Sequence, residues 1–260
     1  MVGSPLLNVM KLSVQKAGRA LARDFGEMEN IQGNRGKLEQ FISHAKENAQ
    51  GVLVDELEKA REGFGYVSSI GSNETQLAER WLINIIDGEE NFIRGIPHWS
   101  ISLALKDKTG VIAGVVYDVV RDQIYYSQKG YGSFVNNKRL KVFDVKDLEG
   151  GVVFSTFSAK SCGAPLTRIS QGKALYDNCI TAIRSMGSIA LDICYMAGNK
   201  GELAFSNVTH PYEVAAAGII AKEAGLFVST LKGDRDFVDG GDILVSTPGL
   251  HGKAMKLLNV

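Results

Sequence analysis

Three carboxylates lie within four residues of this chain, in the stretch NIIDGEEN at positions 84–91. They belong to Asp87, Glu89 and Glu90, and Gly88 separates the first from the other two. Carboxylate oxygens are the ligands that Mg²⁺ prefers in proteins. A glycine turn that leads into a helix also directs backbone N–H groups at an anion, as in phosphate sites. The residue types therefore indicate a metal site or a phosphate site.

Each of these side chains also has a purely structural interpretation. Asp87 is suited to capping a helix, and Glu89 and Glu90 are favourable charges for a first helical turn. The four histidines are scattered without H-x-x-x-H spacing, which argues against a zinc site. The three cysteines, at positions 162, 179 and 194, form no C-x-x-C pair, so we expect buried thiols in a reducing compartment.

The bulk composition sets limits on partners and location. The 260 residues include 29 basic and 29 acidic side chains, so the net charge is zero. A zero net charge gives no general reason to expect nucleic acid or an anionic membrane as a partner. The first fifteen residues contain neither a signal peptide nor a membrane span, and we expect a cytoplasmic protein.

Two long helices are expected before the carboxylate stretch. Ser4-Pro5 is a helix-start signal, a hydroxyl N-cap followed by proline at the first helical position. Apolar residues at helical spacing follow it and recur at 38–57, while residues 71–80 are polar and expected to form a loop. The run 81–86, WLINII, has the length and composition of a buried strand.

The remaining chain mixes strands and helices without βαβ regularity. Runs rich in β-formers between 100 and 142, separated by turn signals, predict an antiparallel meander. From residue 152 the sequence predicts strands at 152–156, 202–206, 226–230 and 242–247 and helices at 188–198, 210–225 and 248–260. We interpret residues 1–260 as one unit with two lobes, roughly 1–150 and 151–260.

Several motifs in order resemble the inositol monophosphatase family, and most closely its bacterial SuhB-like branch. They are WLINIIDGEENFIRGIPHWSISLAL, GVVYD, KGYGSFVNNKRLKV and HPYEVAAAGIIAKEAG. The resemblance implies an α/β (α+β) fold, the layered αβαβα sandwich of the inositol monophosphatase and fructose-1,6-bisphosphatase sugar-phosphatase superfamily. It also implies a homodimer, Mg²⁺-dependent hydrolysis of small phosphate esters and, for the SuhB branch, transcription machinery as a partner.

The family's D-P-x-D-G-T motif shows which site residues are changed. Its first metal-binding aspartate falls on Asn84, which keeps an amide oxygen but no charge, and its second is kept as Asp87. The glycine is kept as Gly88, whereas the threonine that helps to activate water falls on Glu89. Glu90 follows in the phosphate-binding turn.

Three further metal positions align elsewhere in the chain. The family's Glu-Glu pair, whose second member binds metal and activates water, falls on Ser69 and Ile70. The aspartate that binds a further metal falls on Lys46. The W-D pair near the C-terminus becomes Tyr212-Glu213, and His210 matches a histidine found in some members. Asp87, Glu213 and a weakened Asn84 are the candidate metal ligands, and Gly88, Glu89, Glu90 and His210 the candidate phosphate or substrate contacts.

These substitutions argue against catalysis. A lysine ammonium about 4 Å from a divalent ion costs roughly 8 kcal/mol at an effective dielectric constant of about 20. We therefore expect weak or lost Mg²⁺ binding, weak or absent phosphatase activity and a scaffold or regulatory role. The alternative is an active Mg²⁺-dependent phosphomonoesterase acting on inositol phosphate or a similar ester. Lys46 is either a solvated helix residue or occupies a metal position and pairs with Asp87 or Glu213.

Overall fold

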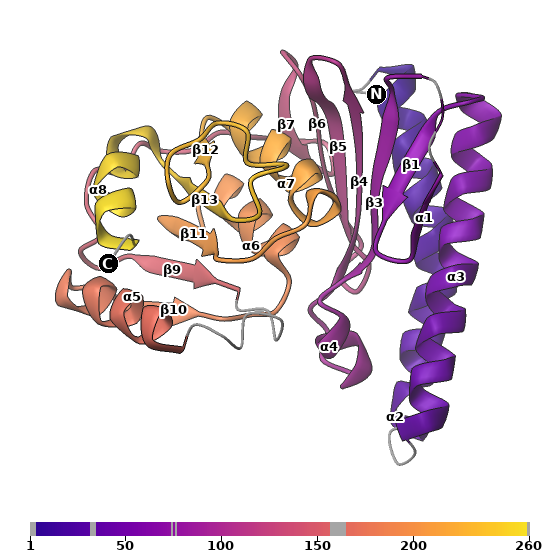
Figure 1. The fold of residues 1–260 in the computed structure, drawn as a ribbon, viewed down its shortest axis with the longest axis horizontal. Coiled ribbons are helices and arrows are strands. Elements are labelled where there is room, and N and C mark those ends of the chain that lie inside the picture. Colours follow the sequence, from indigo (N-terminus) through magenta and orange to yellow (C-terminus); the bar gives the residue numbers. More distant parts are fainter. Residues whose placement is uncertain (1–3, 32–34, 74, 76, 157–164, 259–260) are drawn as a thin grey trace.

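The computed structural model describes residues 4–31, 35–73, 75, 77–156 and 165–258. Helices and sheets alternate in five layers, as Figure 1 shows from the helical pair α1 and α3 to the C-terminal helix α8. The layered αβαβα arrangement expected from the motifs is confirmed. No helix in the described ranges is both long and apolar enough to cross a membrane.

The first layer consists of α1 (Pro5–Gly26) and α3 (Arg35–Ala60), with the short α2 (Met28–Ile31) between them. Ser4 caps α1 by accepting a hydrogen bond from the N–H of Leu7, as the Ser4-Pro5 signal predicts. Met10 and Leu21 belong to the predicted apolar stripe and are fully buried. This stripe holds α1 against the first sheet and against α3.

The strands of the described chain form an eight-stranded sheet and a five-stranded sheet, called here the large and the small sheet. The order in the large sheet is β2-β1-β3-β4-β5-β6-β7-β8, and apart from the parallel pair β1 and β3 its neighbours are antiparallel. Residues 71–80 are therefore not entirely a loop, because Gly71–Asn73 pairs with β1. The strands are β1 (Gly65–Ser68), β2 (Gly71–Asn73), β3 (Arg80–Asp87), β4 (Ser100–Asp107), β5 (Gly110–Asp118), β6 (Gln123–Gln128), β7 (Gly132–Val135) and β8 (Lys138–Leu140).

The middle layer contains α6 (Ile189–Ala197), which is buried throughout, and α7 (Pro211–Ala224), most of whose residues are buried. Gly114 on β5 allows α7 to approach closely, since a Cβ there would lie 2.7 Å from the carbonyl oxygen of Ala216. Both helices lie within the predicted helices 188–198 and 210–225, and the glycines that close those ranges are the C-caps, Gly198 for α6 and Gly225 for α7.

The small sheet has the order β10-β9-β11-β13-β12, and α5 (Pro165–Asp177) and α8 (Pro248–Leu258) form the last layer. Helix α5 and strand β10 are not among the elements that the sequence predicts. Among the cysteines, Cys194 is buried as expected, Cys179 is exposed contrary to expectation, and Cys162 lies outside the described residues. The strands are β9 (Val152–Ser155), β10 (Ala182–Arg184), β11 (Leu203–Ser206), β12 (Phe227–Ser229) and β13 (Ile243–Ser246).

One short helix departs from the layers. Helix α4 (Glu89–Ile93) follows β3 directly and lies below the large sheet in Figure 1, next to the lower ends of α1 and α3. The carboxylate stretch is therefore split between the buried end of β3 and the exposed start of α4.

Candidate functional site

Asp87 is buried at the end of β3 and caps a helix that is distant in sequence. Its Oδ2 atom accepts a hydrogen bond of 3.0 Å from the N–H of Ala190 and a short one from the hydroxyl of Ser188. Ser188 is itself the N-cap of α6 and accepts from the N–H of Leu191. The capping role considered for Asp87 is therefore present in the structure, but the helix is α6 rather than the adjacent α4.

The environment of Asp87 favours its protonated form. Burial raises the pKa of the Asp87 carboxyl to about 7, and the nearby charges of Glu213 and Asp192 add to this rise. Hydrogen bonds from Ser188 and Ala190 oppose the rise by stabilising the carboxylate. Near neutral pH this group is thus divided between its charged and neutral forms.

Asn84 faces Asp87 with its donor rather than its acceptor. Its amide nitrogen lies 3.2 Å from Asp87 Oδ1 and donates a hydrogen bond to it within the buried end of β3. The two residues are separated by an irregularity in the pairing of β3 with β4, between the pairs Asn84–Ser102 and Asp87–Ser100. The amide of Asn84 therefore donates to Asp87 at the position where the family motif has another aspartate.

Gly88 turns the chain from β3 into α4. Its φ of 91° is in the left-handed region, and a Cβ there would lie 3.0 Å from the carbonyl oxygen of His98. Asn91 secures the other side of α4 by donating to the carbonyl oxygens of His98 and Met186, both at 2.7 Å. The position of α4 is therefore fixed by hydrogen bonds to two segments, one at His98 and one at Met186.

Lys46 of α3 pairs with Glu89 at the start of α4. Its Nζ atom lies 2.8 Å from Glu89 Oε2, with side-chain exposures of 12% for the lysine and 46% for the glutamate. Of the two alternatives for Lys46, the solvated helix residue does not match this mostly buried side chain, and the partner of the lysine is Glu89 rather than Asp87 or Glu213. Glu89, which replaces a threonine of the family motif, reaches the lysine because it lies on the exposed first turn of α4, whereas Asp87 is buried behind it.

A cavity of about 210 Å³ surrounds this ion pair. It is bounded by α3, α4 and the end of the β1–β2 hairpin, where Ile70 contributes an apolar wall. Ile70 is 37% exposed, and Ser69 beside it is exposed. The polar lining comes mostly from α3, with Glu89 added by α4, and the side chains concerned are Glu39, Ser43, Lys46, Glu47 and Glu89.

Glu213 and His210, the two candidate site residues at the start of α7, cap that helix. Glu213 Oε2 accepts a hydrogen bond of 2.8 Å from the N–H of His210, which closes the first turn of α7. The ring of His210 stacks on that of Tyr212, with centroids 5.3 Å apart. Glu90 is exposed on α4. Glu213 is near enough to raise the pKa of Asp87, and it is the second carboxylate of the candidate metal set.

The arrangement does not fit the Mg²⁺ site that the family motif describes. Mg²⁺ requires near-octahedral oxygen ligands, commonly with more than one carboxylate. Here Asp87 is engaged by three donors, Asn84 directs an N–H₂ group at it, and Lys46 contributes a positive charge. Within the ranges that the structure describes, no three His, Cys, Asp or Glu side chains converge in a geometry that could hold a metal ion.

The sequence reading missed several residues that build this site. Ser188 hydrogen-bonds to Asp87, and Asp192 lies on the same helix, accepting from the hydroxyl of Thr156 at 2.8 Å. His98 Nε2 is 3.9 Å from Asp192 Oδ1, and both side chains are buried. Ser188 is the first residue of the predicted helix 188–198 and has the hydroxyl of an N-cap, but nothing local in the sequence indicates that it faces Asp87.

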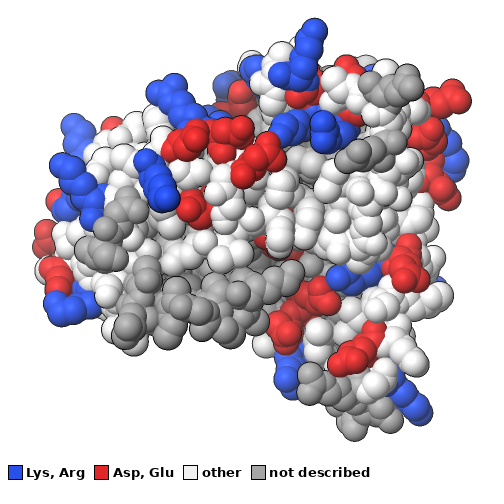
Figure 2. Space-filling view, viewed as in Figure 1, with Lys and Arg blue, Asp and Glu red and all other residues white. Residues whose placement is uncertain are grey.

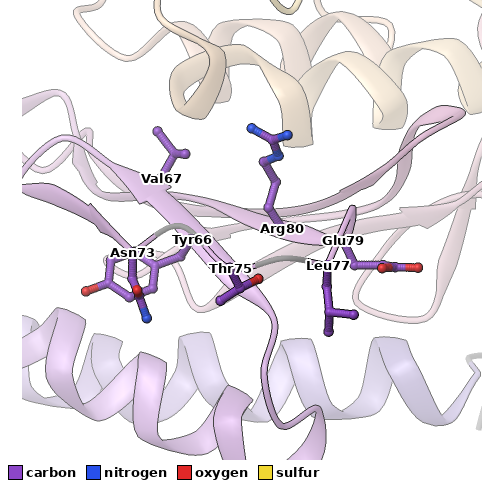
Figure 3. A pocket seen from close by; sticks show the side chains of 8 residues that line it. Tyr66, Val67, Asn73, Thr75, Leu77, Glu79 and Arg80 are labelled. Atoms are coloured by element: carbon purple, nitrogen blue, oxygen red, sulfur yellow. The ribbon is translucent and has the colours of Figure 1, made fainter.

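A separate pocket of about 120 Å³ lies at the edge of the large sheet, beside the beginning of β3. Figure 3 shows that Val67 and Arg80 extend to one side of the strands, whereas Leu77 extends to the other, toward the helices drawn in purple. Because its side chains diverge, this pocket presents no group of converging polar atoms comparable to the residues around Asp87.

Proteins of known sequence and structure resemble this chain over nearly its whole length. A model of the inositol monophosphatase family matches residues 4–259. The chain is 32% identical to an inositol-1-monophosphatase of Mesorhizobium japonicum, over 98% of this chain and 97% of the relative, and 27% identical to the Nus factor SuhB of Escherichia coli, over 94% and 92%. The crystal structure of the extragenic suppressor protein SuhB from Bartonella henselae is 27% identical and superposes with a TM-score of 0.87, covering 99% of this chain and all of that one.

Proposed function

The chain belongs to the inositol monophosphatase family, and we propose that it is a member with weak or absent phosphatase activity that acts as a scaffold or regulator. The observation that carries this proposal is the 2.8 Å ion pair between Lys46 and Glu89. It brings a cation and an anion to the positions that, by alignment with the family motifs, serve a metal ion and a water-activating threonine.

The two substitutions compensate for each other. Glu89 alone would place a negative charge where a phosphate should meet the start of α4, and Lys46 alone would repel a divalent ion. Together they neutralise each other, so the site remains stable without a metal. A charge pair with one exposed partner contributes about 0–1 kcal/mol to stability, and its main effect here is to occupy the cavity.

A scaffold role requires a partner. Relatives at 26–28% identity are named Nus factor SuhB, which makes the transcription machinery the partner class that we propose for this chain. We also propose a homodimer in the cytoplasm, as expected from the family resemblance. Pull-down with a purified bacterial elongation complex, compared with an unrelated protein of similar charge, tests the first of these proposals.

Restoration of the family ligands tests the assignment of the site. The variant Asn84→Asp, Glu89→Thr, Ile70→Glu, Lys46→Asp recovers the aligned acids and the threonine. Titration calorimetry with Mg²⁺ should show binding to this variant at least about tenfold tighter than to the wild-type protein. Equal affinities for the two proteins would show that the site has been misplaced.

The second candidate function is Mg²⁺-dependent hydrolysis of inositol phosphate or a similar ester. The observation in its favour is that Asp87 lies within electrostatic reach of Glu213 and Asp192, which both raise its pKa. Neighbouring carboxylates of this kind would gain from a bound cation. This function requires Lys46 to leave the cavity, so Lys46→Ala should increase Mg²⁺ affinity if the alternative is correct.

A further inference from the structure

A third and larger cavity lies at the opposite end of the large sheet from Asp87. It has a volume of about 570 Å³, within the range of small-molecule sites. Ser100 pairs with Asp87 and Asp107 is at the other end of the same strand, a separation of about 23 Å at about 3.3 Å per residue. This cavity is therefore distinct from the site at α4.

Basic side chains enter this cavity from four separate segments. Lys108 comes from the β4–β5 turn, Lys129 from the end of β6, Lys222 from α7 and Arg235 from the loop after β12. In the part of the chain that the structure describes, none of these four has a carboxylate within 4.0 Å, whereas Lys106, also in the lining, pairs with Asp239 at 2.6 Å. Figure 2 shows basic and acidic side chains side by side along the upper edge of the molecule.

Two of the three acidic side chains in the lining are engaged by the backbone. Glu223 accepts from the N–H groups of Gly130 and Gly132 at 2.9 and 3.0 Å and so closes the β6–β7 turn. Asp107 accepts from the N–H and the hydroxyl of Thr109, both at 2.7 Å. Asp236 is the third acidic side chain. With Lys106 paired to Asp239, four basic groups face three acidic ones, and the cavity carries a small net positive charge.

The floor of the cavity is apolar and closely packed. Phe237 is buried against α7, where Gly218 makes room for it, since a Cβ at Gly218 would lie 2.3 Å from the phenyl ring. The ammonium of Lys222 lies 4.5 Å from the centroid of the same ring. Burial lowers the pKa of Lys222; the charge of Asp236 opposes this change and the smaller effect of Arg235 adds to it, so an anion in the cavity would further stabilise the charged ammonium.

From this geometry we infer that the cavity binds a small anion carrying two or more phosphate groups. Cations on separate walls match charges that are spaced apart, and a phosphate offers several acceptor oxygens to lysine and arginine donors. A hollow with an apolar floor encloses a compact ligand. An extended nucleic-acid backbone would instead require a basic stripe, and the chain as a whole has no net charge. The inference is independent of the function proposed for the α4 site.

Calorimetric titration with inorganic pyrophosphate, in low salt with EDTA, tests the inference on the full chain. The test variant is Lys222→Met/Arg235→Gln, which keeps apolar stems over Phe237 and Phe227. The matched control is Lys59→Met/Arg61→Gln at the end of α3, with the same loss of charge. Affinity should fall at least about tenfold in the test variant and remain within about twofold of wild type in the control.

A second measurement on the wild-type protein does not depend on the folding of any variant. Pyrophosphate should slow acetylation of Lys222 and Lys129, read by mass spectrometry, and leave Lys59 unchanged. No binding of pyrophosphate at millimolar concentration, equal losses in the two variants, or protection that appears only with an RNA oligonucleotide would each overturn the inference.

Discussion

The side-chain amide of Asn84 donates to the carboxylate of Asp87 at a distance of 3.2 Å inside the end of β3. The family motif has two aspartates at these positions, which carry like charges, whereas Asn84 and Asp87 are a hydrogen-bond donor and an acceptor. A bound metal ion would neutralise two such carboxylates, whereas here the amide of Asn84 donates a hydrogen bond to the one that is present. Asn84 and Asp87 thus satisfy each other by a direct hydrogen bond at the end of β3.

The variant Asn84→Asp should therefore lose stability. A second carboxylate would face a buried carboxyl whose pKa is already raised to about 7, and one of the two would have to remain protonated. We expect a loss of about 1–3 kcal/mol in the free energy of unfolding, measured by urea denaturation near neutral pH. Mg²⁺ should recover part of this loss in the variant. The isosteric control Asn91→Asp, whose amide contacts only backbone carbonyls, should not respond to Mg²⁺.

Asp87 should also give the protein a stability that falls as pH rises. Its pKa is raised from 3.8 in the unfolded chain to about 7 in the fold, so the folded state binds the proton more tightly. Its contribution is fully present below about pH 4 and is lost as pH rises through about 7. Asp87→Asn keeps an acceptor for Ser188 and Ala190 but cannot titrate.

Denaturation at about pH 5 and about pH 8 measures this effect. Relative to Asp87→Asn, the wild-type protein should lose stability between these two values. Parallel changes in the two proteins would show that Asp87 does not titrate in this window.

His251 should make the stability of the protein depend on pH in the opposite direction. Its ring lies between two buried hydroxyls, with Nε2 2.8 Å from Ser229 Oγ and Nδ1 2.8 Å from Ser246 Oγ. Ser229 Oγ lies 2.6 Å from the carbonyl oxygen of Thr230, and Ser246 Oγ lies 3.1 Å from that of Thr247. A neutral ring therefore fits best if Nε2–H donates to Ser229 and the hydroxyl of Ser246 donates to Nδ1.

Burial lowers the pKa of His251 below its ordinary value of 6.5, so the unfolded state binds the proton more tightly. Stability from this group is present above about pH 6.5 and is lost as pH falls below it. Between about pH 7 and about pH 5 the wild-type protein should therefore lose stability relative to His251→Gln, which cannot titrate. His44→Gln, a control on the exposed surface of α3, should leave the decline unchanged.

Sequence reasoning was most successful where the determinant is local. The caps at Ser4, Gly198 and Gly225 were readable because each one acts within a single helical turn. The partners of Lys46 and Asp87 were not, since Glu89 lies 43 residues from the lysine and Ser188 lies 101 residues from the aspartate. Those contacts depend on how layers pack. Helix α5 was missed because its described residues carry Gly172 and two exposed apolar side chains, Ile169 and Tyr176.

Gly88→Ala should disturb the site by moving α4. A side chain there would be strained at a φ of 91° and would press on the carbonyl oxygen of His98. We expect a loss of about 2–4 kcal/mol from strain and overpacking together. Gly241→Ala is the matched control, because its φ is 79° and a Cβ there meets nothing within 4 Å. The control should cost about 1 kcal/mol. Equal losses would mean that the contact with His98 is unimportant.

The most direct test of the central claim is phosphate release from inositol 1-phosphate at saturating Mg²⁺, with the Mesorhizobium japonicum relative as the positive control. The account predicts that the wild-type chain releases phosphate no faster than its Asp87→Ala variant. Clear Mg²⁺-dependent release by the wild type that disappears in Asp87→Ala would contradict it.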